Sequence, residues 1–177
     1  MLAAEKPIQM DEEGKVWQIK IRDDYYWADY GPTKGKNAQI TADTVIYSFK
    51  MCLDPDLQNP KASLLTNNAQ MQILNAYEYQ QQYSTGIAVE WDEVGLKKID
   101  DFTVEVTTVK PSNQHGVMVG MGSYAWGYMI YEPLFEECMS EDRSYTTYGT
   151  TVDTYACAGE YMLEEWYPDG KIKVIRN

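Results

Sequence analysis

Apolar and polar side chains alternate along residues 16–22 of the chain. Trp17, Ile19 and Ile21 occupy one set of positions, and polar or charged residues occupy the positions between them. A period of two is typical of a β-strand that buries one face. The pattern therefore predicts a strand here, with Trp17 directed into the core.

A β-hairpin is predicted over residues 94–109. The segment 102–109 alternates in the same way as the first strand, and a second short apolar segment precedes it at 94–99. Asp100 and Asp101 lie between the two segments, where a tight turn can reverse the chain.

The end of the chain predicts a second hairpin, formed by strands at 161–166 and 171–175. Four residues separate the strands, with Pro168 second and Gly170 fourth. Proline and glycine at these positions are typical of a type I turn.

Two helices are predicted between the first strand and the first hairpin. One begins after Thr41, a favourable N-cap, and ends at Asp54, because the residue before a proline is disfavoured in the α conformation. After a turn-rich stretch at 54–60, a second helix is expected over 63–83. The glutamine run at 80–82 is interpreted as a solvated face. The apolar contacts are expected to be Ile46, Phe49 and Leu53 in the first helix, and Met71, Ile73, Leu74 and Tyr77 in the second.

The order of these elements predicts the fold class. It runs strand, two helices, hairpin, an irregular segment at 112–131 expected to hold a short helix with loops, and a last hairpin. Strands joined by tight turns are antiparallel. We therefore predict an α+β fold, an antiparallel sheet with helices packed on one face. Residues 16–177 are expected to form a single domain, preceded by a leading segment, 1–15, that is either native or introduced for expression.

Charge and hydropathy exclude several classes of partner. The net charge of −12 disfavours binding to nucleic acid and to anionic lipid. No run approaches the roughly 18 to 20 apolar residues that a membrane span needs. Residues 1–6 lack the features of a signal sequence, so such a sequence is either absent or lies outside this chain.

The three cysteines leave two possibilities open. Either Cys138 and Cys157 pair as a disulfide in an oxidising compartment, or all three, with Cys52, are small buried thiols. No CxxC pair and no histidine at ligand spacing accompany them, so we expect no metal site.

The chain lacks the residue constellations of an enzyme. It has no GxSxG, HExxH, Walker A or GxGxxG motif, and its single histidine, His115, stands among polar residues. Glu164 and Glu165 are adjacent on a predicted strand, so we expect them to face opposite sides and not to act on one bond. We therefore expect a protein that is not an enzyme and that holds no cofactor.

The 15 tyrosines and five tryptophans raise a carbohydrate-binding hypothesis. Aromatic rings exposed on one sheet face could stack on sugar rings. The hypothesis requires Trp17, Trp91 and Trp166 to be exposed and coplanar. The alternative is that each ring packs inside the protein, which the strand pattern already favours for Trp17. The candidate rings are Trp17, Trp27, Trp91, Trp126 and Trp166.

Four blocks of sequence share the pattern of a known family. They are VWQIKIRDD followed by WAD, ITADTVIYSFK followed by LDP, VGLKKIDDFTVEV, and AGEYMLEEW followed by KIKVIRN. In order and spacing they resemble the family 5 extracellular solute-binding proteins, the oligopeptide and dipeptide receptors of ABC importers. The resemblance covers residues 16–177. The chain departs from the family's pattern in a longer loop at 30–39 and at Glu160, where proline is common.

The resemblance implies a periplasmic-binding-protein-like fold of the type II, peptide-binding class, of which this chain would be an internal part of the first lobe. It implies a substrate-binding component that captures oligopeptides outside the membrane and delivers them to an ABC permease. Such a receptor would be a monomer, lipid-anchored in the periplasm or at the cell surface. The alternatives are the carbohydrate-binding module above, or a receptor of the same family for nickel, haem or an oligosaccharide.

The resemblance also points to a place of ligand contact. The family holds most of its ligand-binding residues in flanking domains. Within this chain, residues 60–65 match the region that comes nearest the ligand, which makes Lys61 and Leu64 the contact candidates.

Overall fold

The computed structural model describes residues 2–66, 71–121, 129–167 and 170–177, with the side chain of Leu64 left out. The chain divides into two compact units. Unit 1 comprises Met1–Asp23 and Thr41–Met129, and unit 2 comprises Asp24–Ile40 and Ile130–Asn177.

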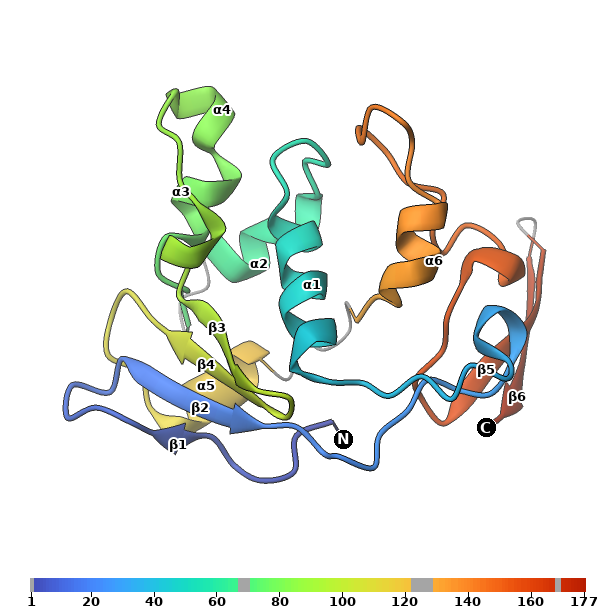
Figure 1. Ribbon diagram of the computed structural model, residues 1–177, viewed down its shortest axis with the longest axis horizontal. Coiled ribbons are helices and arrows are strands. Elements are labelled where there is room, and N and C mark those ends of the chain that lie inside the picture. Colours follow the sequence, from blue (N-terminus) through green and yellow to red (C-terminus); the bar gives the residue numbers. More distant parts are fainter. Residues whose placement is uncertain (1, 67–70, 122–128, 168–169) are drawn as a thin grey trace. The chain divides into compact units, whose positions relative to one another are not determined.

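Unit 1 is built on an antiparallel sheet of four strands in the order β1-β2-β4-β3 (Figure 1). Its strands are β1 (Ile8–Gln9), β2 (Val16–Lys20), β3 (Leu96–Asp100) and β4 (Thr103–Thr107). The antiparallel sheet with packed helices confirms the predicted α+β class. β1 comes from the leading segment, 1–15, and pairs with β2.

The alternation along β2 produces the buried face that it predicted. Trp17, Ile19 and Ile21 are each no more than 3% exposed. Trp17 lies opposite Val106 and Ile19 opposite Val104, so the two strands bury one shared face. The indole Nε1 of Trp17 donates a hydrogen bond to the Gly14 carbonyl oxygen at 2.9 Å, which satisfies the one polar atom of the ring.

The hairpin predicted at 94–109 is confirmed as β3 and β4. Its turn is held by the Asp100 carboxylate, which accepts the backbone N–H of Phe102 at 2.8 Å. Next to the turn, the Lys98 ammonium pairs with Asp101 at 2.8 Å and with Asp43 at 2.6 Å. These contacts join the hairpin to the start of the first helix.

The first predicted helix is α1 (Ala42–Leu53), which packs against β3 and β4 (Figure 1). It begins after Thr41, whose side chain takes part in a capping box with Thr44, and it ends before Asp54, as predicted. Phe49 and Leu53 are buried as expected, but Ile46 is only half-buried. Val45, next to Ile46, takes the buried position on that side of the helix.

The second predicted helix, over 63–83, is wrong as a continuous element. The structure has three short helices instead: α2 (Ser63–Thr66), α3 (Ala76–Gln80) and α4 (Gln82–Thr85). Residues 67–70 of the expected helix lie outside the described part.

The helical prediction fails at residues 71–75 because this stretch pairs with the edge of the sheet. Ile73 forms an isolated bridge with Thr108, and Met71 and Ile73 are both buried. Asn75 then takes a left-handed conformation with φ of 56°, which a helix interior does not accept. Leu74 and Tyr77, expected as apolar contacts, are exposed instead.

Three further short helices belong to the described part of unit 1. They are the 3-10 helices η2 (Pro60–Ala62) and η3 (Trp91–Glu93), and the helix α5 (Gln114–Val119). The Asn113 side chain caps α5 by accepting the backbone N–H of Gly116 at 2.8 Å. The short helix expected within 112–131 is therefore present, while residues 122–128 of that segment lie outside the described part.

Unit 2 contains the last predicted hairpin, the antiparallel pair β5 (Tyr161–Tyr167) and β6 (Lys171–Arg176). The backbone N–H of Gly170 donates to the carbonyl oxygen of Tyr167 at 3.1 Å and closes the four-residue turn. Pro168 and Asp169 lie outside the described residues, so the predicted type I turn falls on residues that the structure does not describe.

The rest of unit 2 consists of short elements with an aromatic interior. They are η1 (Gly31–Thr33), α6 (Glu132–Glu137) and η6 (Val152–Thr154). The buried ring of Trp27 makes an edge contact with Tyr131, 5.7 Å between ring centroids. Phe135 of α6 lies 5.4 Å from the ring of Tyr148.

No helix in the described part of the chain is both long enough and apolar enough to cross a membrane.

Candidate binding site

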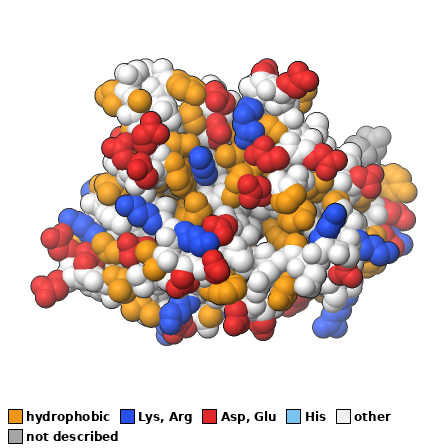
Figure 2. Space-filling view, in the orientation of Figure 1, with side chains coloured by type: hydrophobic (Ala, Val, Ile, Leu, Met, Phe, Trp, Pro, Cys, Tyr) orange, Lys and Arg blue, Asp and Glu red, His pale blue; other side chains and the backbone are white. Residues whose placement is uncertain are grey.

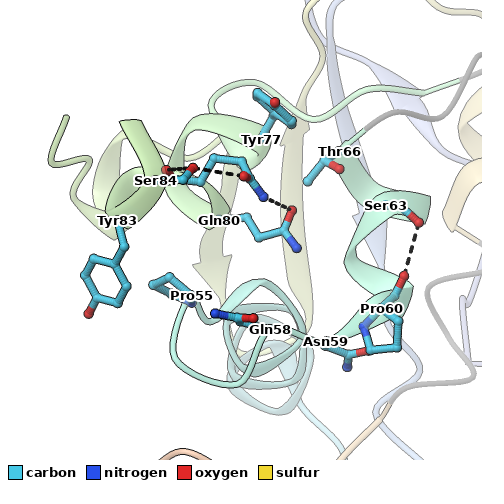
Figure 3. Close-up of a pocket in the computed structure, with 11 residues that line it drawn as sticks. Pro55, Gln58, Asn59, Pro60, Ser63, Thr66, Tyr77, Gln80, Tyr83 and Ser84 are labelled. Carbon is cyan, nitrogen blue, oxygen red and sulfur yellow. Dashed lines mark hydrogen bonds between the residues drawn. The ribbon is translucent and has the colours of Figure 1, made fainter. Parts of the chain in front are cut away.

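Unit 1 contains a cleft of about 540 Å³, shown in Figure 3. We call it the unit 1 cleft. Three elements form its walls: the loop after α1, the start of η2 and α2, and the pair α3 and α4. The lining residues are Pro55, Gln58, Asn59, Pro60, Ser63, Thr66, Tyr77, Gln80, Gln81, Tyr83 and Ser84.

The loop wall is shaped by the way α1 ends. The carboxylate of Asp54 accepts the backbone N–H of Asp56 at 2.9 Å, and its carbonyl oxygen accepts the backbone N–H of Gln58 at 3.3 Å. Gln58 has a φ of 45°, the left-handed conformation that few residues other than glycine adopt. This bend turns the loop around the mouth of the cleft.

The second wall is fixed by local capping. The Asn59 side chain accepts the backbone N–H of Lys61 at 2.9 Å, which caps η2. The Ser63 hydroxyl donates to the carbonyl oxygen of Pro60 at 3.2 Å. Thr66 at the end of α2 is only 3% exposed, so it lies at the deep end of this wall.

The third wall is the junction between α3 and α4. Gln81 stands between the two helices, and its carbonyl oxygen accepts the Ser84 hydroxyl at 2.8 Å. Its side-chain amide donates to the Gln80 side chain at 3.4 Å (Figure 3). The rings of Tyr77 and Tyr83 are 49% and 67% exposed and lie at opposite ends of this wall. The predicted solvated face at 80–82 thus contributes Gln80 and Gln81 to the cleft.

The cleft is lined by neutral groups, while acidic side chains surround it. Among the residues that the structure describes, none of those lining the cleft is Lys, Arg, Asp or Glu. The Tyr83 hydroxyl donates to the Asp56 carboxylate at 3.3 Å, and the charge of Asp56 raises the pKa of Tyr83. Burial raises the pKa of Tyr79, and the charge of Asp54 adds a smaller increase. Figure 2 shows acidic side chains scattered over this face with lysines and arginines between them, and the net charge of −12 gives a field that disfavours anionic ligands.

Lys61 and Leu64, the two predicted ligand contacts, lie beside this cleft, and neither is among its described lining residues. Lys61 is exposed on η2, and its neighbour Pro60 lines the cleft while Lys61 does not. Leu64 lies in α2, and its side chain is outside the described part. The sequence did not predict that glutamines and tyrosines of α3 and α4 line a cleft. They line it because the chain leaves the helical conformation at Asn75, which the local pattern does not indicate.

The tryptophans do not form the platform that a carbohydrate-binding surface of this type requires. Trp17 is 3% exposed, and Trp27 is 5% exposed. Trp91 lies on η3 and packs edge-on against Tyr79, with 5.3 Å between ring centroids. Trp166 is 39% exposed but belongs to a different sheet from Trp17. Trp126 lies outside the described residues.

The paired carboxylates of β5 differ from expectation. A β-bulge interrupts the strand between Leu163 and Glu165. Because of this extra residue, the Lys173 ammonium lies 2.6 Å from Glu164 and 3.9 Å from Glu165. The prediction that the two glutamates face opposite sides was therefore wrong, and the arrangement is an ion pair with one lysine.

The three cysteines are free thiols in the structure. Cys52 and Cys157 are buried and Cys138 is half-buried. Burial raises the pKa of the Cys52 thiol to about 11, which suppresses the thiolate form that reacts. Among the residues that the structure describes, no group of three His, Cys, Asp or Glu side chains is placed to hold a metal ion.

Comparison with known proteins identifies the class. The model of the bacterial extracellular solute-binding proteins, family 5 (middle), matches residues 1–177. The chain belongs to this family.

Two curated relatives are periplasmic oligopeptide-binding proteins called OppA. The protein from Escherichia coli K12 is 30% identical over 101 residues, which is 57% of this chain and 16% of the relative. The protein from Salmonella typhimurium LT2 is 22% identical over 167 residues, 94% of this chain and 26% of the relative. The chain thus spans about a quarter or less of the length of these relatives.

Solved structures share the fold. An oligopeptide ABC transporter substrate-binding domain from Bacillus anthracis Ames aligns with a TM-score of 0.74 and 23% identity, covering 100% of this chain and 29% of that one. The peptide-bound OppA of Listeria monocytogenes aligns with a TM-score of 0.73 and 23% identity, covering 100% of this chain and 30% of that one. The chain therefore has the periplasmic-binding-protein fold that its sequence predicts.

Proposed function

We propose that the chain is part of the substrate-binding component of an ABC importer, which captures oligopeptides outside the membrane and delivers them to a permease. The observation that carries this proposal is the family match over the whole chain, 1–177. Relatives named as oligopeptide-binding proteins support the choice of ligand. In this proposal the receptor is a monomer anchored by lipid at the outer face of the membrane.

The mechanism we propose is closure of two lobes around an extended peptide, followed by docking on the permease. The role of this chain is to supply rigid scaffold. Its sheet buries Trp17, Ile19 and Val104 almost completely, so it can move as one body when lobes close. Most ligand contacts then come from other parts of the receptor, with Lys61 and Leu64 as the contacts proposed within this chain.

Isothermal titration calorimetry with the receptor that contains this chain tests the proposal. Peptides of increasing length are titrated beside nickel, haem and an oligosaccharide. We expect strong heat from peptides, none from nickel or haem, and from the oligosaccharide no more than weak binding in the millimolar range. Binding of nickel, haem or the oligosaccharide in place of peptide would show a family member with a different ligand.

The proposed contact at Lys61 has a matched control. Lys34 is also an exposed lysine, on the loop after η1 of unit 2. We expect Lys61→Ala to weaken peptide binding several-fold and Lys34→Ala to leave it unchanged. Equal affinities for the two variants would remove Lys61 from the site while leaving peptide binding itself in place.

A further inference from the structure

We infer that the unit 1 cleft is a binding site for a small neutral saccharide. The inference is independent of the peptide binding proposed above, since it rests only on residues of unit 1 and on the chemistry of their side chains.

The first argument is the charge of the walls. Among the described lining residues, every polar side chain is a neutral amide or a hydroxyl. Asp54 and Asp56 lie beside the cleft; the charge of Asp56 raises the pKa of Tyr83, and the charge of Asp54 adds to the larger effect of burial in raising the pKa of Tyr79. A phosphate or carboxylate would enter this negative field without a cation among the described lining residues, because Lys61 lies beside the cleft and does not line it. The ligand is therefore expected to be neutral.

The second argument is the hydrogen-bonding capacity of the walls. An amide side chain both donates and accepts, and so does a hydroxyl. The lining includes side-chain amides from Gln58, Asn59 and Gln80 and hydroxyls from Ser63 and Ser84, and both the η2–α2 wall and the α3–α4 wall carry an amide and a hydroxyl (Figure 3). A ligand with many hydroxyl groups, each of which also donates and accepts, matches this set. Within the described residues, the exposed side-chain amide of Gln58 takes part in no hydrogen bond, so it is available to such a ligand.

The third argument is the apolar part of the lining. Tyr77 and Tyr83 offer exposed aromatic faces, and Pro60 offers an exposed, rigid aliphatic one. Sugar rings have C–H faces that pack on such surfaces while their hydroxyls reach the surrounding polar groups. The volume of about 540 Å³ lies in the range typical of small-molecule sites.

A peptide fits the described lining less well. Proteins bind peptides by pairing them with the edge of a sheet or by holding them in a hydrophobic or aromatic-lined groove. Others use polar or charged groups that hold the peptide termini. The lining comes from loops and short helices, without a strand and without a charged side chain. Tyr77 and Tyr83 lie at opposite ends of the α3–α4 wall and do not form a continuous aromatic groove.

The test is an NMR titration of the 177-residue chain with maltose, cellobiose and diacetylchitobiose, with trialanine as the peptide comparison. We expect at least one disaccharide at millimolar concentration to shift the side-chain amide signals of Gln58 and Gln80, and trialanine to leave them unchanged. No shift with any of the three disaccharides, or shifts with trialanine alone, would overturn the inference.

Two variants make the test specific. Tyr83→Ala removes an aromatic face, and we expect it to weaken disaccharide binding about tenfold, the loss typical of an aromatic anchor at a binding site. Tyr145→Ala is the matched control, since Tyr145 is 62% exposed and belongs to unit 2. Gln58→Asn keeps an amide and suits the left-handed backbone while shortening the reach, so it should weaken binding without disturbing the fold.

Circular dichroism melts of the three variants establish that each is folded. Binding that Tyr83→Ala and Gln58→Asn leave unchanged would place the saccharide elsewhere and overturn the assignment.

Discussion

The backbone of Gly95 lies directly against Leu74. The N–H of Gly95 donates to the carbonyl oxygen of Leu74 at 2.8 Å, and a Cβ added to Gly95 would meet the Cβ of Leu74 at 2.9 Å. On its other side that Cβ would collide with the carbonyl oxygen of Thr107. This close approach holds the 71–75 segment on the sheet edge, and with it the start of the helices that wall the cleft.

Gly95→Ala is therefore expected to destabilise the chain. The added methyl group has to displace the Thr107 carbonyl oxygen on one side and the Leu74 Cβ on the other. Overpacking of this kind costs about 1–3 kcal/mol. Urea unfolding followed by circular dichroism measures the change. Gly159→Ala is the control, because a Cβ there meets nothing within 4 Å. Equal stability of the two variants would contradict the close packing at Gly95.

The break in the second predicted helix can be tested at Asn75. The residue has a φ of 56° and its side chain donates to the carbonyl oxygen of Glu93 at 2.9 Å. Asn75→Ala is expected to lower the free energy of unfolding by roughly 1–2 kcal/mol, since alanine is strained in the left-handed region. Asn75→Gly relieves that strain, so it should recover part of the loss. If Asn75→Ala were the more stable of the two, the segment would be helical after all.

Burial distinguishes two isoleucines that both lie on strands. Ile19 of β2 is 2% exposed, whereas Ile172 of β6 is 63% exposed. We expect Ile19→Ala to cost about 2–5 kcal/mol and Ile172→Ala to cost well under that, because only the first leaves a cavity. Chemical denaturation of both variants checks this. A large effect at Ile172 would show that the chain buries this strand in solution, for example by self-association.

The same denaturation curves test how the chain unfolds. We propose that residues 16–177 behave as one domain, with the leading segment packed on its sheet through β1. A single transition reported alike by a probe in each unit is then expected. Separate transitions would show that unit 1 and unit 2 are domains of their own.

Alkaline pH should weaken the fold through Cys52. Burial raises the folded-state pKa of this thiol from 9.0 to about 11, so the folded state holds its proton where the unfolded state releases it. The stabilisation is full below pH 9.0 and is lost as the pH rises towards about 11. A shift of this size corresponds to roughly 3 kcal/mol.

The measurement is urea unfolding of the wild type and of Cys52→Ala across that pH range. The stability of the variant is expected to fall less steeply with pH, because the thiol no longer contributes. Parallel pH profiles would mean that Cys52 ionises equally well in the folded chain.

Local sequence patterns were enough to predict the elements whose signal lies within a few residues. The alternation around Trp17 and Ile19 requires one buried face, and Thr41 and Pro55 mark the two ends of α1 through backbone hydrogen bonding and steric exclusion. Antiparallel hairpins follow because a tight turn can join strands in no other way. The family blocks rest on the same local signals, which is why the sequence alone also identified the class of fold.

Tertiary structure decided the features that depend on how one segment pairs with another. The sequence around Ile73 is compatible with a helix, and only pairing with Thr108 at the sheet edge makes it extended. The bulge that brings Glu164 and Glu165 to one lysine depends on the pairing of β5 with β6.

The unit 1 cleft arises for the same reason. Pairing with the sheet gains backbone hydrogen bonds and buries Met71 and Ile73, and these gains outweigh a weak helix propensity. The helix is broken as a result, and its second half turns to face the loop after α1. The sequence by itself therefore determined the scaffold and the family, and the contacts between distant segments determined the site.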